Sequence, residues 1–339
     1  MMLFRPAHPD DVESLYQLAL DGGVGLTTLP KDKSQLSARV KLSEDSFNKK
    51  INEPENENYL FVLEDTLAHK VVGVSAIEAA VGMETPFYSY KISRKSRLSH
   101  ELNIRSDYKI LSLVNDYQGH SEICTLFLDK NYRVKGNGLL LSKARFLYMA
   151  NFPKRFSKTV IAEMRGVSDA AGHSPFWEGV GQHFFQMPFS QADQLTSSTN
   201  KQFIADLMPT TPIHISLLAE EAQQVIGKPH QSTIPAVKIL EKEGFRYTGY
   251  VDIFDAGPSL EVPLNDIKTI KNSQLYTIRD MIDEVNDNNY FVANTKPRIR
   301  ASIGNILVDE QNLTCILSHK LAELLEVTEG DQVRISQFT

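Results

Sequence analysis

One stretch, residues 122–151, constrains the fold more than any other. Its first part, Glu122 to Leu128, is strongly apolar and predicts a buried central strand. The loop Arg133 to Gly138 follows, with glycines at 136 and 138, and the helical period then runs from Leu139 to Asn151. Glycines let the backbone approach an anion closely, and the free N–H groups at a helix start favour negative charge there. The stretch therefore predicts a strand–loop–helix unit that binds phosphate.

The helical period also predicts which side of this helix is buried. Lys143 and Arg145 are expected to face solvent. The apolar positions expected on the buried side are Leu139, Leu140, Phe146, Leu147 and Met149.

Two familiar phosphate loops are excluded. No Gly-x-Gly-x-x-Gly follows a strand with an acid about 20 residues further on, and the loop does not end in Gly-Lys-Ser/Thr. The pattern is instead Arg133-x-x-Gly136-x-Gly138. A plain surface turn between strand and helix is the alternative interpretation.

Composition and charge limit the function classes. The chain has 339 residues, 42% hydrophobic and 23% charged, which is typical of a soluble globular protein of about two or three units. The net charge is −6, and the richest basic stretch, Lys91 to Arg105, is expected to be a solvated surface segment, so nucleic acid is not an expected partner. No transmembrane span or signal peptide is expected, so no membrane partner is predicted. The two cysteines, Cys124 and Cys315, lie in apolar runs and predict buried thiols of a reducing, cytoplasmic compartment.

The other elements are read from periodicity and from turn residues. The main expectations are a strand at 3–6, helices at 12–19 and 34–50, a hairpin at 59–64 and 71–80, antiparallel strands within 85–116, a strand at 160–164, a helix from Ser174 to Gly181, a helix at 234–243, a strand at 245–254, and a tail of strands with one helix.

At this point the sequence resembles the GNAT acyltransferase superfamily, whose loop is Arg/Gln-x-x-Gly-x-Gly/Ala between a strand and a helix. The resemblance implies an α+β fold with a mixed, mostly antiparallel sheet flanked by helices. It places Leu126, Phe127 and Leu128 beside the pantetheine of an acyl-CoA, and it places Arg133, Lys135, Gly136, Asn137 and Gly138 around the pyrophosphate.

Longer phrases resemble the arginine N-succinyltransferase family, from about residue 2 to residue 270 and more loosely to the end. They are Gly25 to Pro30, Glu122 to Leu128, Ala162 to Gly166, Ser174 to Trp177 and Asp252 to Pro258. The family implies direct transfer of succinyl from succinyl-CoA to the α-amine of L-arginine, giving N2-succinylarginine and CoA in arginine catabolism. It implies succinyl-CoA as co-substrate without a permanently bound cofactor, and a homo-oligomer or paired α and β chains.

Three segments are expected. Residues 1–190 would form a GNAT-like acyl-CoA-binding domain and residues 191–272 a partial second GNAT-like half that completes the active site. The order helix, glycine, aromatic residue occurs twice, around Gly181 and around Gly244. A partial duplication is one interpretation of this similarity, and an ordinary helix end explains it nearly as well. Residues 273–339 would form a small β-barrel-like module for packing or subunit contact, with the cofactor site elsewhere.

The family resemblance assigns the acid/base role to His230, in the shared phrase Val225 to His230. Acyl transfer needs a neutral amine, and a histidine titrates near the required pH. A helix-capping or surface histidine is the alternative for this position.

Charged residues are candidates for holding the substrates. A guanidinium is best met by a carboxylate, and Glu78, Glu122, Glu163 and Asp252 lie in apolar runs where an unpaired acid is costly. Solvent-facing strand positions are the alternative for each acid. The succinyl carboxylate needs a cation, for which Arg165 is the first choice and Arg39 the second. No histidine pair has metal-ligand spacing with a carboxylate, so no metal is expected.

Two other functions remain open. One is a GNAT amine acyltransferase with another donor or acceptor, such as ornithine. The other is a non-catalytic acyl-CoA-binding subunit. The sequence does not decide the arginine or ornithine preference, the oligomeric state, or which acids bind the guanidinium.

Overall fold

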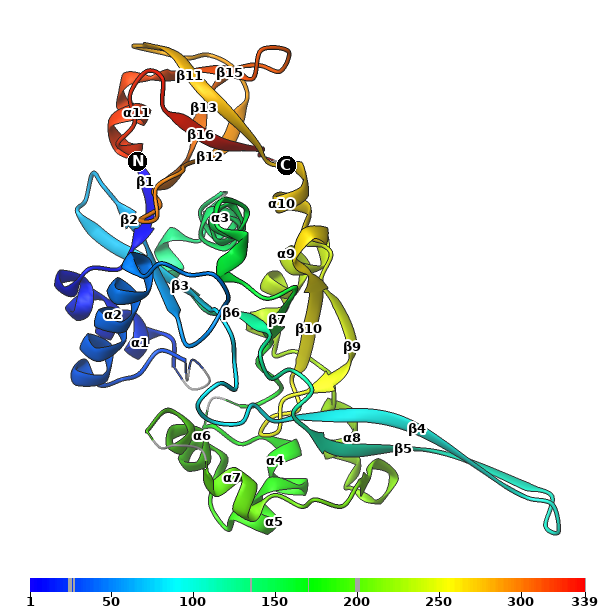
Figure 1. Ribbon diagram of the computed structural model, residues 1–339. Helices are drawn as coiled ribbons and strands as arrows, with labels where there is room; N and C mark the ends of the chain where they lie inside the picture. The colour runs from blue at the N-terminus through cyan, green and yellow to red at the C-terminus, as the bar shows by residue number, and fades with distance from the viewer. Residues whose placement is uncertain (24–25, 27, 135, 170, 199–201, 339) are drawn as a thin grey trace. The chain divides into compact units, whose positions relative to one another are not determined.

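The computed structural model describes residues 1–338 except 24–25, 27, 135, 170 and 199–201. The chain divides into two compact units, each assembled from separate segments (Figure 1). Unit 1 comprises Met1–Ala79, Ile123–Lys158 and Pro263–Thr339, and unit 2 comprises Ala80–Glu122 and Thr159–Val262. The expected boundaries after residues 190 and 272 stay a prediction.

Unit 1 contains a sheet in the strand order β14-β15-β11-β16-β12-β13-β1-β2-β3-β6. Strand β1 pairs antiparallel with both β2 and β13, so the C-terminal strands continue the N-terminal sheet. Strands β11 and β15 run parallel. The elements are β1 (Met2–Pro6), α1 (Val12–Asp21), α2 (Lys33–Asn48), β2 (Asn58–Asp65), β3 (Lys70–Glu78), β6 (Ser121–Leu128, in unit 1 from Ile123), α3 (Asn137–Asn151), α10 (Lys268–Asn272), β11 (Gln274–Ile282), β12 (Asn289–Asn294), β13 (Ala301–Asn305), β14 (Leu307–Asp309), β15 (Thr314–Ser318), α11 (His319–Leu325) and β16 (Gln332–Gln337).

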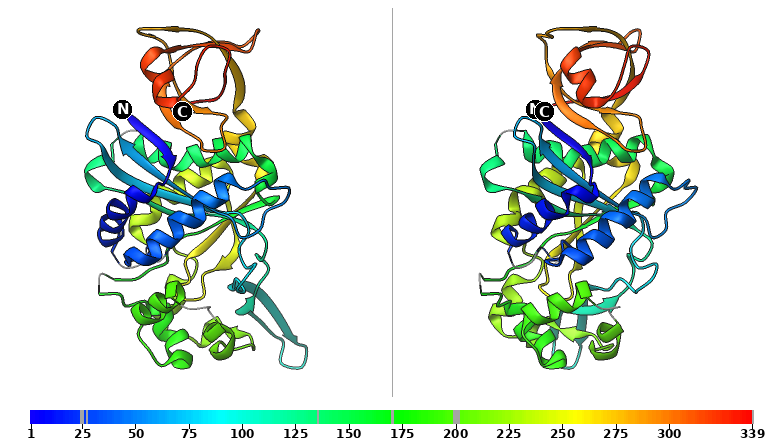
Figure 2. Two further views of the ribbon diagram at one scale, coloured as in Figure 1. Left: turned by 60° about the vertical axis from the view of Figure 1, so that its left-hand side comes forward. Right: turned by 90° about the vertical axis from the view of Figure 1, so that its left-hand side faces the viewer.

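Alternate residues of β2 face two different layers of helices. Leu60 and Val62 belong to the apolar core shared with α1 and α2, which lie side by side in Figure 2. Phe61, between them, stacks on Phe4 at 4.7 Å between ring centroids and contacts Tyr148 of α3 at 5.5 Å. Successive side chains of a strand point to opposite faces, so the continuous apolar run of β2 is explained by burial on both faces.

The expectation that Lys143 and Arg145 face solvent is wrong. Both are buried, with 8% and 1% of their surface exposed. Helix α3 packs on β1 and β3 and also on β12, β13 and α10, so it has no solvent-facing side at these positions. The period of a helix reports its apolar side but not how many layers cover it.

Unit 2 contains the strand order β6-β7-β10-β9-β4-β5-β8, in which β6 contributes Ser121 and Glu122. The ladder between β6 and β7 is parallel, and β10–β9, β9–β4, β4–β5 and β5–β8 are antiparallel. The elements are β4 (Ser89–Ser99), β5 (Ile104–Val114), β7 (Thr159–Glu163), α4 (Pro175–Gly179), α5 (Gly181–Phe185), α6 (Phe189–Ser198), α7 (Gln202–Leu207), β8 (Ile213–His214), α8 (Glu220–Val225), α9 (Ile234–Glu243), β9 (Arg246–Val251) and β10 (Pro258–Pro263).

The helical part of unit 2 is organised around Trp177. Ser174 caps α4, its hydroxyl accepting from the Trp177 N–H at 3.4 Å, and Pro175 occupies the first turn, as the sequence predicts. The indole is buried and stacks on Phe254 at 5.5 Å, and its Nε1–H donates to the Met187 carbonyl at 2.9 Å. This contact fixes the segment that follows β9 against α4.

The predicted basic surface stretch lies on the hairpin of β4 and β5, which extends away from the rest of unit 2 (Figure 1). Its base pairs with β9 through Tyr90 and Lys91, and its outer part, from Arg94 onwards, is exposed. The predicted fold class, a mixed and mostly antiparallel sheet with helices and a β-rich C-terminal region, is confirmed. Within the described residues, no helix combines the length and the apolar character needed to span a bilayer.

Candidate active site

The predicted phosphate loop joins β6 to α3 within unit 1. Gly136 is the N-cap of α3, with φ of 101°, a backbone conformation that side chains disfavour. Its carbonyl accepts from the Leu140 N–H at 2.8 Å, and the Asn137 amide donates to the Tyr132 carbonyl at 3.0 Å. The N–H groups in the first turn of a helix have no partner inside it, so a 15-residue helix that begins at this loop offers donors to an anion.

Arg133 and Phe127 connect the loop to the end of β6. The Arg133 Nε donates to the Leu128 carbonyl at 3.0 Å, and its guanidinium lies 5.8 Å from the centre of the Phe127 ring. Arg133 is otherwise exposed, so its remaining N–H donors face solvent. Gly138 lies in the first turn of α3, while Lys135 lies outside the described residues.

Strand β6 has two features that sequence reasoning missed or only implied. Its parallel ladder with β7 pairs Ser121 with Val160 and Glu122 with Ile161, at the start of the strand. Thr125 within it has φ of 56° although it is buried, which is strained for a β-branched residue. No signal in the sequence marks this position.

Arg39 of α2 holds the Thr125 side chain. Its Nη2 donates to the Thr125 hydroxyl at 3.0 Å, and its Nη1 donates to the Thr28 carbonyl. The second-choice cation for the succinyl carboxylate therefore lies beside the middle of β6, already engaged with the main chain.

Arg165 and His230 come together in unit 2. Arg165 follows β7, and its carbonyl accepts from the His230 N–H at 2.8 Å. The Arg165 guanidinium donates to the Ser168 hydroxyl at 2.8 Å. Two of the predicted site residues, 65 positions apart in the sequence, thus form one cluster.

His230 also caps a short helical turn, which is the alternative that the sequence left open. The Ser232 N–H donates to its Nδ1 at 3.1 Å, and the Ser232 hydroxyl lies 2.7 Å from the same nitrogen. Burial first and the charge of Arg165 second hold the pKa of His230 below its usual value of 6.5, although a hydrogen bond to the Ser168 main chain raises it. The ring is therefore neutral at neutral pH, as a general base must be.

A pair of acids, with Asp255 buried and Asp252 half-buried, stabilises the loop that carries Arg165. Asp255 accepts from the Gly166 N–H at 2.7 Å and from the Gly257 N–H at 2.8 Å. Asp252 accepts from the N–H groups of Phe254 and Asp255 at 2.7 and 2.9 Å. Burial raises the pKa of both acids, and that of Asp255 is raised further by the charge of Asp252. Asp252, a candidate for the guanidinium, is thus engaged by its own turn.

The remaining acid candidates lie at strand ends. Glu163 is the last residue of β7 and is half-buried, with the Ser259 hydroxyl 3.5 Å from its carboxylate. Glu122 is buried in β6 on unit 2, and Glu78 is half-buried at the end of β3 on unit 1. Glu163 is two residues from Arg165, which puts both on the segment next to His230.

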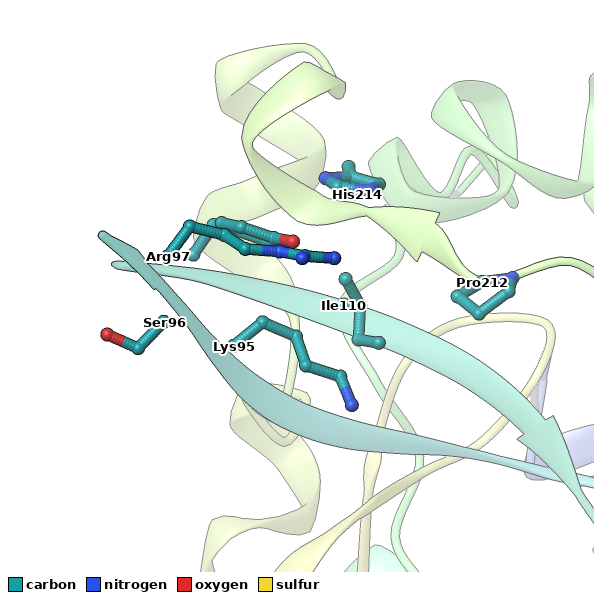
Figure 3. Close-up of a pocket in the computed structure, with 7 residues that line it drawn as sticks. Lys95, Ser96, Arg97, Ile110, Pro212 and His214 are labelled. Carbon is teal, nitrogen blue, oxygen red and sulfur yellow. The ribbon is translucent and has the colours of Figure 1, made fainter. Parts of the chain in front are cut away.

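A surface hollow of about 380 Å³ lies elsewhere in unit 2, against the hairpin (Figure 3). Tyr108 and His214 stack within it at 4.8 Å. It is lined by Lys95, Ser96, Arg97, Tyr108, Ile110, Pro212 and His214. None of these seven residues is a candidate for the chemistry.

Comparison with known proteins covers the whole chain. The family described as arginine N-succinyltransferase beta subunit matches residues 2–269, and its C-terminal domain matches residues 274–337. An arginine N-succinyltransferase of Photorhabdus laumondii is 46% identical over 99% of this chain and 98% of its own length. One from Yersinia pestis is 44% identical over 99% of this chain and 97% of its own.

A solved structure agrees with these sequence matches. Subunit AI of arginine/ornithine succinyltransferase from Pseudomonas aeruginosa superposes with a TM-score of 0.91 at 32% identity, covering 99% of this chain and 98% of that one. The match spans both family regions. From its sequence and its fold, the chain belongs to the arginine N-succinyltransferase family.

Proposed function

We propose that the protein transfers the succinyl group of succinyl-CoA to the α-amine of L-arginine, giving N2-succinylarginine and CoA, as a step of arginine catabolism. The observation that carries the proposal is the full-length match to arginine N-succinyltransferases. The strand–loop–helix unit around Gly136 supports it, because this geometry suits the pyrophosphate of an acyl-CoA.

The loop and strand β6 would bind the donor. Arg133, Gly136, Asn137 and Gly138, with Lys135 beside them, would surround the pyrophosphate. The backbone of Leu126, Phe127 and Leu128 would lie along the pantetheine.

The cluster around Arg165 would serve the acceptor. His230 would remove a proton from the α-ammonium of arginine so that the neutral amine attacks the thioester carbonyl. The thiolate of CoA then leaves and takes the proton from His230, and His230 in turn accepts the second proton that the nitrogen loses as the amide forms. Direct transfer needs no covalent acyl-enzyme, and Cys124 is buried among apolar side chains, which suits a packing role.

Glu163 and Arg165, which lie on the segment next to His230, would bind the charged groups of the two substrates. Glu163 is proposed to contact the guanidinium, with Glu78 and Glu122 as further candidates, and Arg165 to contact the succinyl carboxylate. Neither a metal nor a permanently bound cofactor is part of the proposal. A cytoplasmic location and a homo-oligomer, or paired α and β chains, complete it.

Arginine-dependent release of free thiol from succinyl-CoA tests the function. The purified chain should release thiol with L-arginine and far less with Nα-acetyl-arginine, whose amine is blocked. Release with another amine but not with arginine would overturn the proposed acceptor. No release with any amine, together with retained CoA binding, would favour a non-catalytic subunit.

Ornithine is the second acceptor to test, because the P. aeruginosa relative is named for both arginine and ornithine. The ratio of kcat/KM for the two amines measures the preference. Acetyl-CoA in place of succinyl-CoA tests the donor in the same assay.

A further inference from the structure

The C-terminal strands contact the proposed pyrophosphate loop within unit 1. A Cβ built on Gly136 would lie 3.2 Å from Ile303 Cδ1 and 3.4 Å from Phe338 Cζ. Ile303 belongs to β13, and Phe338 follows β16. The α carbon of Gly136 is therefore covered by two apolar side chains that are more than 160 positions away in the sequence.

Phe338 is itself held by aromatic packing. Its ring lies 5.1 Å from that of Phe291 on β12, and its N–H donates to the Asn289 carbonyl at 3.4 Å. The Nζ of Lys143 on α3 lies 5.4 Å from the centre of the same Phe291 ring. Phe338 therefore packs on Gly136 of the loop and also on Phe291, which in turn contacts Lys143 of α3.

The same strands also hold the far end of α3. The Arg334 Nε donates to the Asn151 side-chain oxygen at 2.7 Å, and the Asn151 amide donates to the Asn294 carbonyl at 3.0 Å. Arg334 also donates to the Ser273 hydroxyl at 3.2 Å. Both ends of α3 are consequently fixed by the same C-terminal region.

We propose that the C-terminal region is part of the acyl-CoA site, and that Phe338 and Ile303 are positioning residues that hold Gly136 in its left-handed conformation. Glycine adopts a φ of 101° readily, but it also reaches many other conformations, so two side chains packed on Gly136 would restrict the loop to one of them. The expected separation of this region from the cofactor site is thereby revised. The inference rests on the proposed function of the loop.

Phe338→Ala removes the ring and leaves the backbone unchanged. If the loop then adopts its binding conformation about one tenth of the time, the KM for succinyl-CoA rises about tenfold. The KM for arginine should stay constant and kcat should change little. Phe338→Leu should restore most of the loss, because an apolar side chain returns to Gly136. Leu307→Ala, at a partly exposed position of β14, is the control.

An acyl donor without the pyrophosphate distinguishes positioning from general packing. S-Succinyl-pantetheine lacks the group that the loop binds, so its kcat/KM should be equal in wild-type protein and Phe338→Ala. Equal losses with both donors would overturn the inference.

Calorimetric titration of full-length protein with CoA separates the inference from the proposed function. Binding to the wild type with about tenfold weaker binding to Phe338→Ala supports both. Equal binding by the two proteins overturns the inference and leaves the proposed function intact. If the wild type does not bind CoA, the proposed function fails.

Discussion

At the scale of single residues, His230 has two roles to separate. Its Nδ1 accepts from the Ser232 N–H, which is a capping contact, while the proposed chemistry needs a group that takes up a proton. Asparagine can accept the capping bond but cannot act as a base near neutral pH. The two roles therefore predict different outcomes for one substitution.

We expect His230→Asn to lower kcat by about a hundredfold or more while CoA binding survives, because the base is lost and the cap is kept. Initial rates with saturating succinyl-CoA and arginine measure this. His183→Asn, at an exposed position, is the matched control. If His230→Asn turns over at a near-normal rate and only His230→Ala is defective, His230 serves as a helix cap and not as the base.

The charge of Arg165 should be visible in the pH profile. This charge, after burial, is the second cause that lowers the pKa of His230. A base must be neutral, so activity is lost as the pH falls through that pKa. Arg165→Gln removes the charge, raises the pKa, and should move the acidic limb of kcat/KM to higher pH.

Lys228→Gln provides the control for Arg165→Gln, since Lys228 is an exposed cation two residues from His230 and is not among the causes of the shift. Its acidic limb should stay in place. An unmoved limb in Arg165→Gln would contradict the assignment of this limb to His230.

At the scale of elements, α3 is the helix that the structure reinterprets most. Its Arg145 is buried, and burial lowers the pKa of the guanidinium to about 10. The side chain donates to the carbonyls of Ser142, Ala76 and Cys124 at 3.1, 3.4 and 3.4 Å. It therefore connects α3 to β3 and β6 at the strand that leads into the loop.

We expect Arg145→Met to lower the free energy of unfolding by about 1–3 kcal/mol, because buried carbonyls lose their donors while the apolar bulk is kept. Urea unfolding monitored by circular dichroism measures this. Lys41→Met, an exposed cation on α2, should change little. An Arg145→Met protein more stable than wild type would show that desolvation of the charge outweighs its hydrogen bonds.

At the scale of the whole molecule, the hairpin of β4 and β5 bears on assembly. Leu98, Leu102 and Ile104 at its outer end are 57%, 67% and 55% exposed. The pairing of the hairpin with β9 and β8 lies at its base, and a two-stranded outer end without a covering layer is marginally stable in water. A second copy of the chain packed on this outer end would bury the apolar side chains and stabilise the two strands, which fits the proposed homo-oligomer.

We expect the double substitution Leu98→Gln and Leu102→Gln to lower the mass measured by light scattering, because it removes the apolar surface available to a second copy. Leu67→Gln, at a turn of unit 1 where the side chain is 76% exposed, should leave the mass unchanged. If the double variant and the wild type have the same oligomeric mass, the contact between copies lies elsewhere. If the wild type is a monomer, the proposed homo-oligomer is wrong.

Much of the architecture could be predicted from local patterns. The strand of residues 122–128, the loop with Gly136, and the helix that starts beside it follow from apolar periodicity and from glycine placement. Ser174 and Pro175 likewise fixed the start of α4. These are local properties, since a backbone conformation or a cap depends on a few neighbouring residues.

Other properties depended on contacts between distant segments. Arg145 is buried because four strands and a second helix surround α3, Thr125 has a positive φ within a strand, and Arg165 meets His230 through a main-chain hydrogen bond across 65 positions. The sequence by itself determined the loop that can receive a phosphate and the family to which the chain belongs. Only the tertiary structure decided that the C-terminal region packs on Gly136 of that loop, because packing between Gly136 and Phe338 is a property of the folded chain and leaves no local periodicity.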